Sequence, residues 1–434
     1  MKKILAFGDN PLITTGFAQV AKQIYEGLNA EYELHVFGIL SDKEDYNREL
    51  GYFLYPNDPV FDPHGLHTFK RHYDSIKPDI LFFIAGAGTI YKHLIHLGYK
   101  NLGMYKEEWE IPTAKIIAYT PVEGMPTNRN HLDCYQLIHE HGGLNIFWTE
   151  ISAYHINQTI PWLNAPYSHF GADHGEFKSY KKEDRDLLRK AIGWDNKFII
   201  TSVGTNKRTK GWPSILYVAK ELKDRGYGDL ITFYLHTDPD HPIMDGYDLK
   251  SMAHANDVAD MVIWKPNIKS NQDGIPYYLD NISYVQNLDK FPISPEDKLH
   301  LFTSYSYISK LNCTDLYLDL SQIEGWGLPQ MEAMSCGVPT LILNDYDVRR
   351  EIFNLENIHN ELFAIEPLEP RLWDTWHSGV RLVNSDPKQV ADKIIFLYEN
   401  QTILDEIKSS QKEIPKQYKW KNTNKKILNL IRGI

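Results

Sequence analysis

Apolar residues in the first third of the chain fall into short runs that alternate with amphipathic stretches. The short runs predict buried strands, and residues 18–28 (AQVAKQIYEGL) repeat their apolar positions at helical spacing. Strands that alternate with helices and end in loops bearing Gly or Pro are typical of a parallel sheet covered on both faces. The predicted strands of this block are residues 4–7, 33–39, 80–84, 115–119 and 145–148.

The same alternation restarts after a stretch that is dense in charge. Residues 178–189 (KSYKKEDRDLLR) separate two apolar blocks and predict a connection between domains. The second block predicts helices over residues 213–222 and 328–336. Its predicted strands are residues 198–203, 230–235, 261–264, 316–320 and 339–343.

These patterns predict an α/β protein of two doubly wound, parallel-sheet (Rossmann-like) domains that face a cleft. In such sheets ligands gather beyond the carboxyl ends of the strands. A length of 434 residues fits two domains, because domains usually hold about 100–200 residues. The expected division is a first domain over residues 1–175, a linker over 176–195, a second domain over 196–411 and a tail helix over 412–434.

Charge and composition narrow the classes of function. A net charge of −11 with 42% hydrophobic residues is ordinary for a globular protein and argues against disorder and against a nucleic-acid packaging role. The apolar run at residues 4–7 is shorter than a signal-peptide core, and no run is long enough to span a membrane. Three scattered cysteines match no zinc or redox spacing. We therefore expect a cytoplasmic protein with free thiols.

The segment 321–341, SQIEGWGLPQMEAMSCGVPTL, carries the most informative chemistry in the chain. It follows a predicted strand and places Gly325 and Gly327 at the start of a helix, where a backbone without side chains can approach a ligand. The free N–H groups and dipole of a helix start favour negative charge, such as a diphosphate. Glu324 in the turn and Glu332 in the helix can each hold a pair of hydroxyls, one on a sugar and one on a ribose.

This segment resembles the glutamate-x7-glutamate signature of the retaining family 4 glycosyltransferases, which have the GT-B fold. The likeness rests on the two glutamates, the glycines between them, Ala333-Met334 and Gly337-x-Pro339, with Trp326 in place of a common Phe. The resemblance implies that a nucleotide-diphosphate sugar binds in the cleft. The donor-binding residues that it implies in this segment are Glu324, Gly325, Trp326, Gly327, Leu328 and Glu332.

Other blocks occur in the order that this family has. Residues 9–17 (DNPLITTGF) end the first strand, and Gly16 resembles the glycine of a family loop that approaches the donor phosphates. Residues 169–177 (HFGADHGEF) resemble the stretch before the interdomain connection. Trp420 and the tail helix resemble a final helix that crosses back to the first domain. The segments that fit the family least are residues 44–104 and 267–291.

The block VGTNKRTKG resembles the family segment whose cations hold the diphosphate. Lys210 matches the family lysine. Thr205 stands at the position of the family arginine, and we expect Arg208 or Lys207 to compensate. Asn206 of the same block is expected to contact the donor. The resemblance implies that these cations neutralise the leaving diphosphate, with no metal or other cofactor, and that the donor is a UDP- or GDP-sugar.

Two glutamates outside these blocks bear on the chemistry. Many family members carry a His near the donor sugar, and this chain has TPVEG at that place. Glu123 of that stretch is expected to accept a sugar hydroxyl or to help deprotonate the acceptor, the alternative being a turn glutamate in solvent. Glu351 resembles a glutamate of the family, and the sequence leaves its role open.

The resemblance thus implies retaining transfer of a sugar to an acceptor hydroxyl, with Glu324, Lys210 and Glu123 as catalytic residues. A glycan or a lipid-linked glycan is the favoured acceptor. The TTGF and PVEG stretches also resemble relatives of large viruses and phages, so a modified DNA base is an alternative acceptor. A nucleotide-sugar epimerase and a non-catalytic nucleotide-sugar binder stay open as alternative functions.

Overall fold

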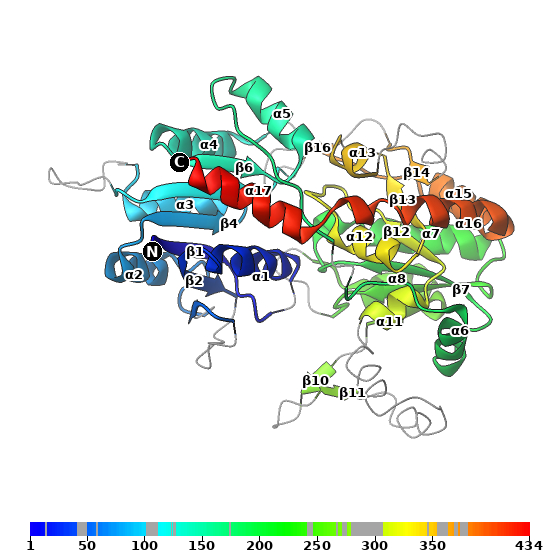
Figure 1. Cartoon of the computed structure of the whole chain (residues 1–434). Helices are drawn as coiled ribbons and strands as arrows, with labels where there is room; N and C mark the ends of the chain where they lie inside the picture. The colour runs from blue at the N-terminus through cyan, green and yellow to red at the C-terminus, as the bar shows by residue number, and fades with distance from the viewer. Residues whose placement is uncertain are drawn as a thin grey trace.

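The structure is a computed structural model in which two sheets stand next to each other, each covered by helices (Figure 1). Within the described residues, no helix is both long enough and apolar enough to cross a lipid bilayer. The residues that the structure describes are 1–13, 15–40, 50–57, 60–100, 112–122, 124, 127–172, 175–240, 246–265, 268–270, 276–278, 307–344, 347–353, 363–368, 372–373 and 381–434.

The first domain is built on six parallel strands. These are β1 (Lys3–Asp9), β2 (Glu33–Ile39), β3 (Phe53–Pro56), β4 (Ile80–Ile84), β5 (Lys115–Thr120) and β6 (Leu144–Phe147). Its helices are α1 (Gly16–Asn29), α2 (Leu66–Ile76), α3 (Ala87–Leu97), α4 (Arg129–Glu140) and α5 (Glu150–Thr159). The strand order β3-β2-β1-β4-β5-β6 changes direction between β1 and β4, so this is the point at which such a sheet binds ligands.

Alternation along the strands divides the core of this domain into two layers. Ile4 and Ala6 of β1 point to one face, and Leu5 and Phe7 point to the other. Helix α1 and the last helix, α17 (Trp420–Arg432), cover the first face. Helices α2 to α5 cover the second face. The strands are therefore buried on both sides, which explains their nearly continuous apolar sequences.

The second domain repeats this plan. Its strands are β7 (Phe198–Val203), β8 (Ile231–His236), β9 (Val262–Trp264), β12 (Leu316–Asp319), β13 (Thr340–Leu343) and β14 (Ala364–Ile365). They are parallel in the order β14-β13-β12-β7-β8-β9, which changes direction between β7 and β12. The expected fold class of two doubly wound parallel-sheet domains is confirmed.

Helices and short pieces complete the second domain. The helices are α6 (Lys182–Ala191), α7 (Trp212–Asp224), α8 (Leu249–Ala255), α11 (Tyr307–Asn312), α12 (Leu328–Ser335), α13 (Asp347–Phe353), α15 (Pro387–Glu399) and α16 (Gln401–Gln411). The 3-10 turns are η1 (Arg208–Lys210), η2 (Ala259–Met261) and η4 (Pro415–Gln417). Two antiparallel hairpins pair β10 (Ile268–Ser270) with β11 (Pro276–Tyr278) and β15 (Leu372–Trp373) with β16 (Arg381–Leu382).

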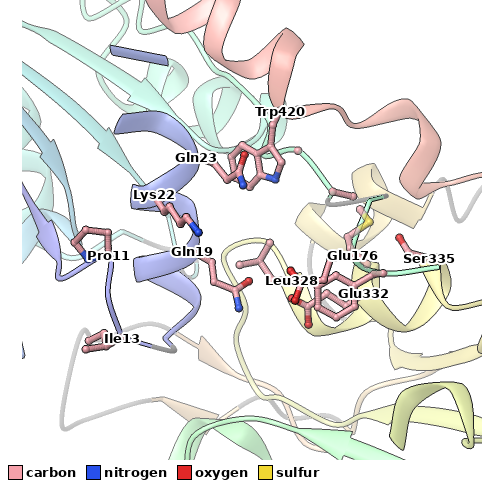
Figure 2. Close-up of a pocket in the computed structure, with 14 residues that line it drawn as sticks. Pro11, Ile13, Gln19, Lys22, Gln23, Glu176, Leu328, Glu332, Ser335 and Trp420 are labelled. Atoms are coloured by element: carbon pink, nitrogen blue, oxygen red, sulfur yellow. The ribbon is translucent and has the colours of Figure 1, made fainter. Parts of the chain in front are cut away.

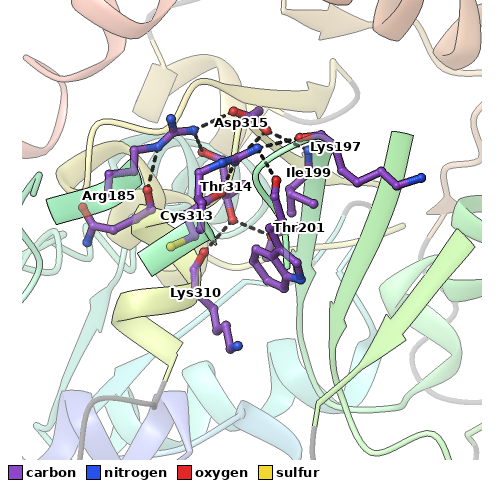
Figure 3. Close-up of polar contacts among 11 residues, drawn as sticks. Arg185, Lys197, Ile199, Thr201, Lys310, Cys313, Thr314 and Asp315 are labelled. Carbon is purple, nitrogen blue, oxygen red and sulfur yellow. Dashed lines mark hydrogen bonds and ion pairs between the residues drawn. The ribbon is translucent and has the colours of Figure 1, made fainter. Parts of the chain in front are cut away.

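Helix α6 lies within the predicted linker, residues 176–195, and is held on the second domain by a partly buried carboxylate (Figure 3). The Asp315 carboxylate pairs with Arg185 at 2.6 Å and with Arg189 at 2.9 Å, and it also accepts a hydrogen bond from the backbone N–H of Ile199 at 2.8 Å. Because both arginines of α6 bind the start of β12, the chain passes from one domain to the other ahead of this helix.

The tail returns to the first domain. Helix α17 packs against α1, and the Asn424 amide donates to the backbone carbonyl of Gln23 at 2.9 Å. At the base of α17, the rings of Trp420 and Phe170 stack with centroids 5.8 Å apart. Figure 1 shows α17, in red, lying along the first domain. The chain therefore crosses between the domains twice.

Several elements differ from the sequence-based expectation. Strand β3 and helices α2 and α3 lie in the segment 44–104, where the sequence analysis predicted only the strand at 80–84. Met261, expected to begin a strand, belongs to η2 because a tight turn precedes β9. The hairpin β10–β11 lies in the polar segment 267–291, and the rest of that segment lies outside the described residues.

We predict that Gly171→Ala loosens the docked tail. A Cβ at this position would lie 2.2 Å from the backbone nitrogen of Trp420, so the base of α17 must move. Overpacking of this kind costs about 1–3 kcal/mol. The measurement is thermal unfolding together with limited proteolysis of the tail. Gly86→Ala is the matched control, because nothing lies within 4 Å of a Cβ there; equal melting temperatures for the two variants would contradict the prediction.

Candidate active site between the two domains

Three of the predicted site residues follow the strands that flank the two points of reversed strand order. Gly16 follows β1, Lys210 follows β7 and Glu324 follows β12. The Lys210 ammonium lies 2.5 Å from a carboxylate oxygen of Glu324, and the two side chains are 24% and 15% exposed. Two residues that the sequence separates widely are thus brought into direct contact at the place where the fold itself favours a ligand.

The loops of the two domains approach each other closely at this place. A Cβ on Gly325 would lie 3.0 Å from Cβ of Pro121 and 3.5 Å from the indole of Trp148, both in the first domain. A Cβ on Gly16 would lie 3.5 Å from a methyl group of Leu328 in the second domain. The missing side chain of Gly325 therefore allows its loop to approach the first domain, whereas a Cβ on Gly16 would make an ordinary contact.

Two further glycines open helices of the second domain toward this region. Gly211 precedes α7 with φ +67°, and Gly327 precedes α12 with φ +95°. Both angles lie in the left-handed region that favours glycine. Among the described residues, no side chain caps either helix start. The first backbone N–H groups of α7 and α12 are thus available to a negatively charged group.

A buried carboxylate holds the loop that carries Glu324. Asp319, the last residue of β12, accepts hydrogen bonds from the N–H of Ser321 at 2.9 Å and from the side chain of Gln330 on α12. Arg349 of α13 pairs with it at 2.9 Å, and both charged side chains are almost fully buried. Burial raises the pKa of the Asp319 carboxyl, but the Arg349 charge and the Ser321 hydrogen bonds outweigh burial and hold that pKa below its ordinary value.

Glu332 lines a cavity of about 220 Å³ between the domains (Figure 2). The Tyr307 hydroxyl donates to its Oε2. Burial, followed by the Glu332 charge, raises the pKa of Tyr307 well above its ordinary value, so the hydroxyl stays a donor. The cavity is closed on the first-domain side by α1, through Gln19, Lys22 and Gln23.

These three polar residues of α1 were missed by the sequence analysis. Gln19, Lys22 and Gln23 are spaced i, i+3 and i+4, so they share one face of the helix. That spacing is readable within the predicted helix over residues 18–28. It marks only a polar face, however, and the sequence does not tell which polar face meets the second domain.

Trp326 occupies a different environment from the rest of its loop. Its side chain is 2% exposed, and its ring packs against His169, Phe170 and Tyr418 with centroids 5.1–5.4 Å apart. The indole therefore anchors the loop to the interdomain crossing and to the returning tail. The donor contact predicted for Trp326 stays a prediction, and in this geometry it falls to the backbone.

Glu351, whose role the sequence left open, joins the two domains. Its carboxylate accepts hydrogen bonds from the backbone N–H groups of Glu150 at 2.9 Å and Ile151 at 2.7 Å, at the start of α5 in the first domain. The same carboxylate lies 2.5 Å from Nε2 of His169. A negative charge at a helix start is favourable. Glu351 thus ties α13 of the second domain to α5 of the first.

The remaining predicted cations lie on the loop after β7. Arg208 opens the turn η1, and Lys207 precedes it. The Lys207 charge reaches Asp9 at the end of β1 in the first domain: burial raises the pKa of the Asp9 carboxyl, and the Thr15 hydrogen bond and the Lys207 charge oppose that rise. The two domains therefore also interact electrostatically across this loop.

The side chain of Asn206 in the same loop forms hydrogen bonds with backbone groups of two other residues. Its amide nitrogen donates to the carbonyls of Asp238 at 3.1 Å and Tyr247 at 2.7 Å, and its amide oxygen accepts from the N–H of Tyr247 at 3.0 Å. The donor contact predicted for Asn206 stays a prediction.

Glu123, predicted as a catalytic residue, lies outside the described residues. In the described part of the chain, no three His, Cys, Asp or Glu side chains gather as a metal site would require.

Solved structures share this arrangement over the whole chain. An Anabaena HepE in complex with UDP-glucose matches with a TM-score of 0.67 and 13% identity over 100% of both chains. Sucrose-phosphate synthase from Thermosynechococcus elongatus matches at 0.66 and 12% over 100% of this chain and 99% of that one. A trehalose-phosphate synthase (UDP-forming) from Burkholderia vietnamiensis matches at 0.62 and 9% over 100% of both. The sequence matches no family profile and no curated protein.

These likenesses define the class of fold. At such low identity, the structural matches establish the backbone arrangement alone. That arrangement is the GT-B fold of two Rossmann-like domains facing a cleft. The fold implied by the glutamate signature is therefore confirmed. The chemistry at the cleft is argued from this chain's own residues.

We predict that Arg349→Met destabilises the second domain by about 3–5 kcal/mol, because it leaves the Asp319 carboxylate buried without its cation. Urea unfolding measures the change. Arg350→Met is the control from the next position on α13, where the side chain is exposed. A loss of stability shared equally by the two variants would contradict this role for Arg349.

Proposed function

We propose that this protein is a retaining glycosyltransferase that moves a sugar from a nucleotide-diphosphate sugar to an acceptor hydroxyl. The observation that carries the proposal is the contact between Lys210 and Glu324 at the carboxyl ends of β7 and β12. It brings a cation and a carboxylate together, beside two helix starts that no side chain of the described residues caps. The GT-B fold supports the proposal. Of the three proteins with similar structures, one is solved with UDP-glucose and two are named as synthases of sugar phosphates.

The contact also indicates how a donor would be received. Without a ligand, the Lys210 ammonium is neutralised by Glu324 at 2.5 Å. A diphosphate carries more charge than one carboxylate and takes over Lys210, which leaves Glu324 to bind hydroxyls of the donor sugar. Stabilising the charge of the leaving diphosphate in this way is worth about 3–4 kcal/mol for one well-placed donor group.

The other residues take roles around this exchange. Glu332 lies on α12, about one turn after the helix begins at Leu328, and would hold the ribose hydroxyls. The Tyr307 hydroxyl donates to Oε2 of this carboxylate and orients it. The N–H groups after Gly211 and Gly327, with Arg208, would share the diphosphate charge, so that no metal is required. Attack by the acceptor hydroxyl on the face from which the diphosphate leaves would retain the anomeric configuration. Glu123 is the candidate base that takes the proton of this hydroxyl.

The donor and the acceptor are proposed as classes. The donor would be a UDP- or GDP-sugar, and UDP-glucose is the first to test because the HepE structure holds it. A glycan or lipid-linked glycan is the favoured acceptor. A modified DNA base would need a local basic groove on a chain whose net charge is −11.

The proposal is tested by incubating the protein with UDP- and GDP-sugars and candidate acceptors, and by following nucleotide release and product mass. We expect Lys210→Ala and Glu324→Ala each to lower transfer by at least about tenfold with the fold intact, because each removes a group that contacts the donor. The exposed pair of Lys220 and Asp224 supplies the matched control, since Lys220→Ala breaks an ion pair within α7 that takes no part in the proposed donor contacts.

The outcomes separate the alternatives. Unchanged rates in both Lys210→Ala and Glu324→Ala would refute the site. Conversion of the donor to its epimer would favour a nucleotide-sugar epimerase, and tight donor binding without turnover would favour a binding protein. The anomeric configuration of the product, measured by NMR, decides between retention and inversion.

A further inference from the structure

The cavity between the domains contains one feature that the proposed donor contacts do not use. Its wall on the first domain is the face of α1 that bears Gln19, Lys22 and Gln23, and its opposite wall is α12 with Glu332 (Figure 2). Figure 2 shows the side chains of Lys22 and Gln19 extending from α1 toward α12. Lys22 is the one Lys or Arg among the described residues that line this cavity.

The charge of this cavity is unbalanced toward the acidic side. Among the described residues that line it, the carboxylates of Glu176 and Glu332 outnumber the one ammonium group, that of Lys22. A diphosphate approaching these carboxylates is repelled unless a cation lies close to its path. Lys210 and Arg208 supply positive charge from the second domain, and Lys210 is already paired with Glu324.

Lys22 is suited to supply charge from the opposite wall. Its side chain is exposed, and among the described residues it forms no salt bridge. A lysine is a compact charge on a flexible stem, so it can follow a ligand into the cavity without a fixed geometry. The neighbouring amides of Gln19 and Gln23 offer both donors and acceptors to the same ligand.

We propose that the cavity holds the ribose and adjoining phosphate of the donor, and that Lys22 binds this phosphate from the first domain. This assignment rests on the proposed function. The cavity volume of about 220 Å³ lies below the roughly 300–1,000 Å³ of pockets that hold a whole drug-sized ligand, so it suits one part of a nucleotide sugar. Glu332 meets the ribose on one side, and α1 meets the phosphate on the other.

A consequence is that the nucleotide bridges the two domains. Lys210 binds it from the second domain and Lys22 from the first, so the ligand is held from both walls. Affinity for the diphosphate then depends on a residue outside the domain that carries the glutamate signature.

The test is calorimetric titration of the full chain with UDP, GDP, uridine and guanosine. We expect Lys22→Met to weaken binding of the preferred diphosphate by about tenfold, the effect of losing one charge-assisted hydrogen bond, and to leave binding of the nucleoside unchanged. Lys22→Arg keeps the charge and is expected to restore affinity. The affinity of Lys22→Met is also expected to fall less with added salt than that of the unmodified chain.

Lys92→Met is the matched control, because Lys92 is an exposed lysine on α3 of the same domain and does not line the cavity. Diphosphate affinity within twofold of the unmodified chain for Lys22→Met, together with a loss for Lys210→Met, would overturn the assignment of Lys22 and leave the proposed function standing. Failure of the unmodified chain to bind any of the diphosphates would overturn both. Equal weakening of diphosphate and nucleoside by Lys22→Met would also refute a phosphate contact.

Discussion

The buried Asp319 carboxylate is the interaction on which the arrangement of the cleft depends. It lies at the carboxyl end of β12, where a buried charge without a partner would destabilise the folded state. Arg349 on α13 supplies the opposite charge. Because α13 is fixed in this way, Glu351, two positions further along, is held at the start of α5 in the other domain. One ion pair thus sets the loop that carries Glu324 and the junction between the domains.

The cleft is a geometric product of two sheets with the same order of strands. Each sheet leaves a gap between helices where its order reverses, and the two gaps face each other through Gly16 and Gly325. This is how a chain of net charge −11 can offer the diphosphate site that we propose. Positive charge does not need to be abundant, since two helix starts and a few cations such as Lys210 are concentrated at one edge.

The sequence was sufficient for the fold class, and it singled out Lys210 and Glu324, which the structure brings into contact. Continuous apolar strands and the glutamate signature depend on local patterns, so they survive as readable spacing even where identity to solved relatives is near 13%. It was insufficient where a contact joins distant segments. Nothing near Glu351 shows that it caps α5, and the polar face of α1 at Gln19, Lys22 and Gln23 looks like any solvated helix face until α12 is placed opposite it.

The returning helix α17 has a consequence for biosynthesis. It covers a face of the first domain, next to α1, yet it follows the whole second domain in the chain. During translation the face of α1 at Gln23 and Gly27, which contacts Asn424 of α17, stays uncovered until the second domain has been made. The first domain therefore completes its packing only after the second domain has been translated and has folded far enough to bring α17 back to α1.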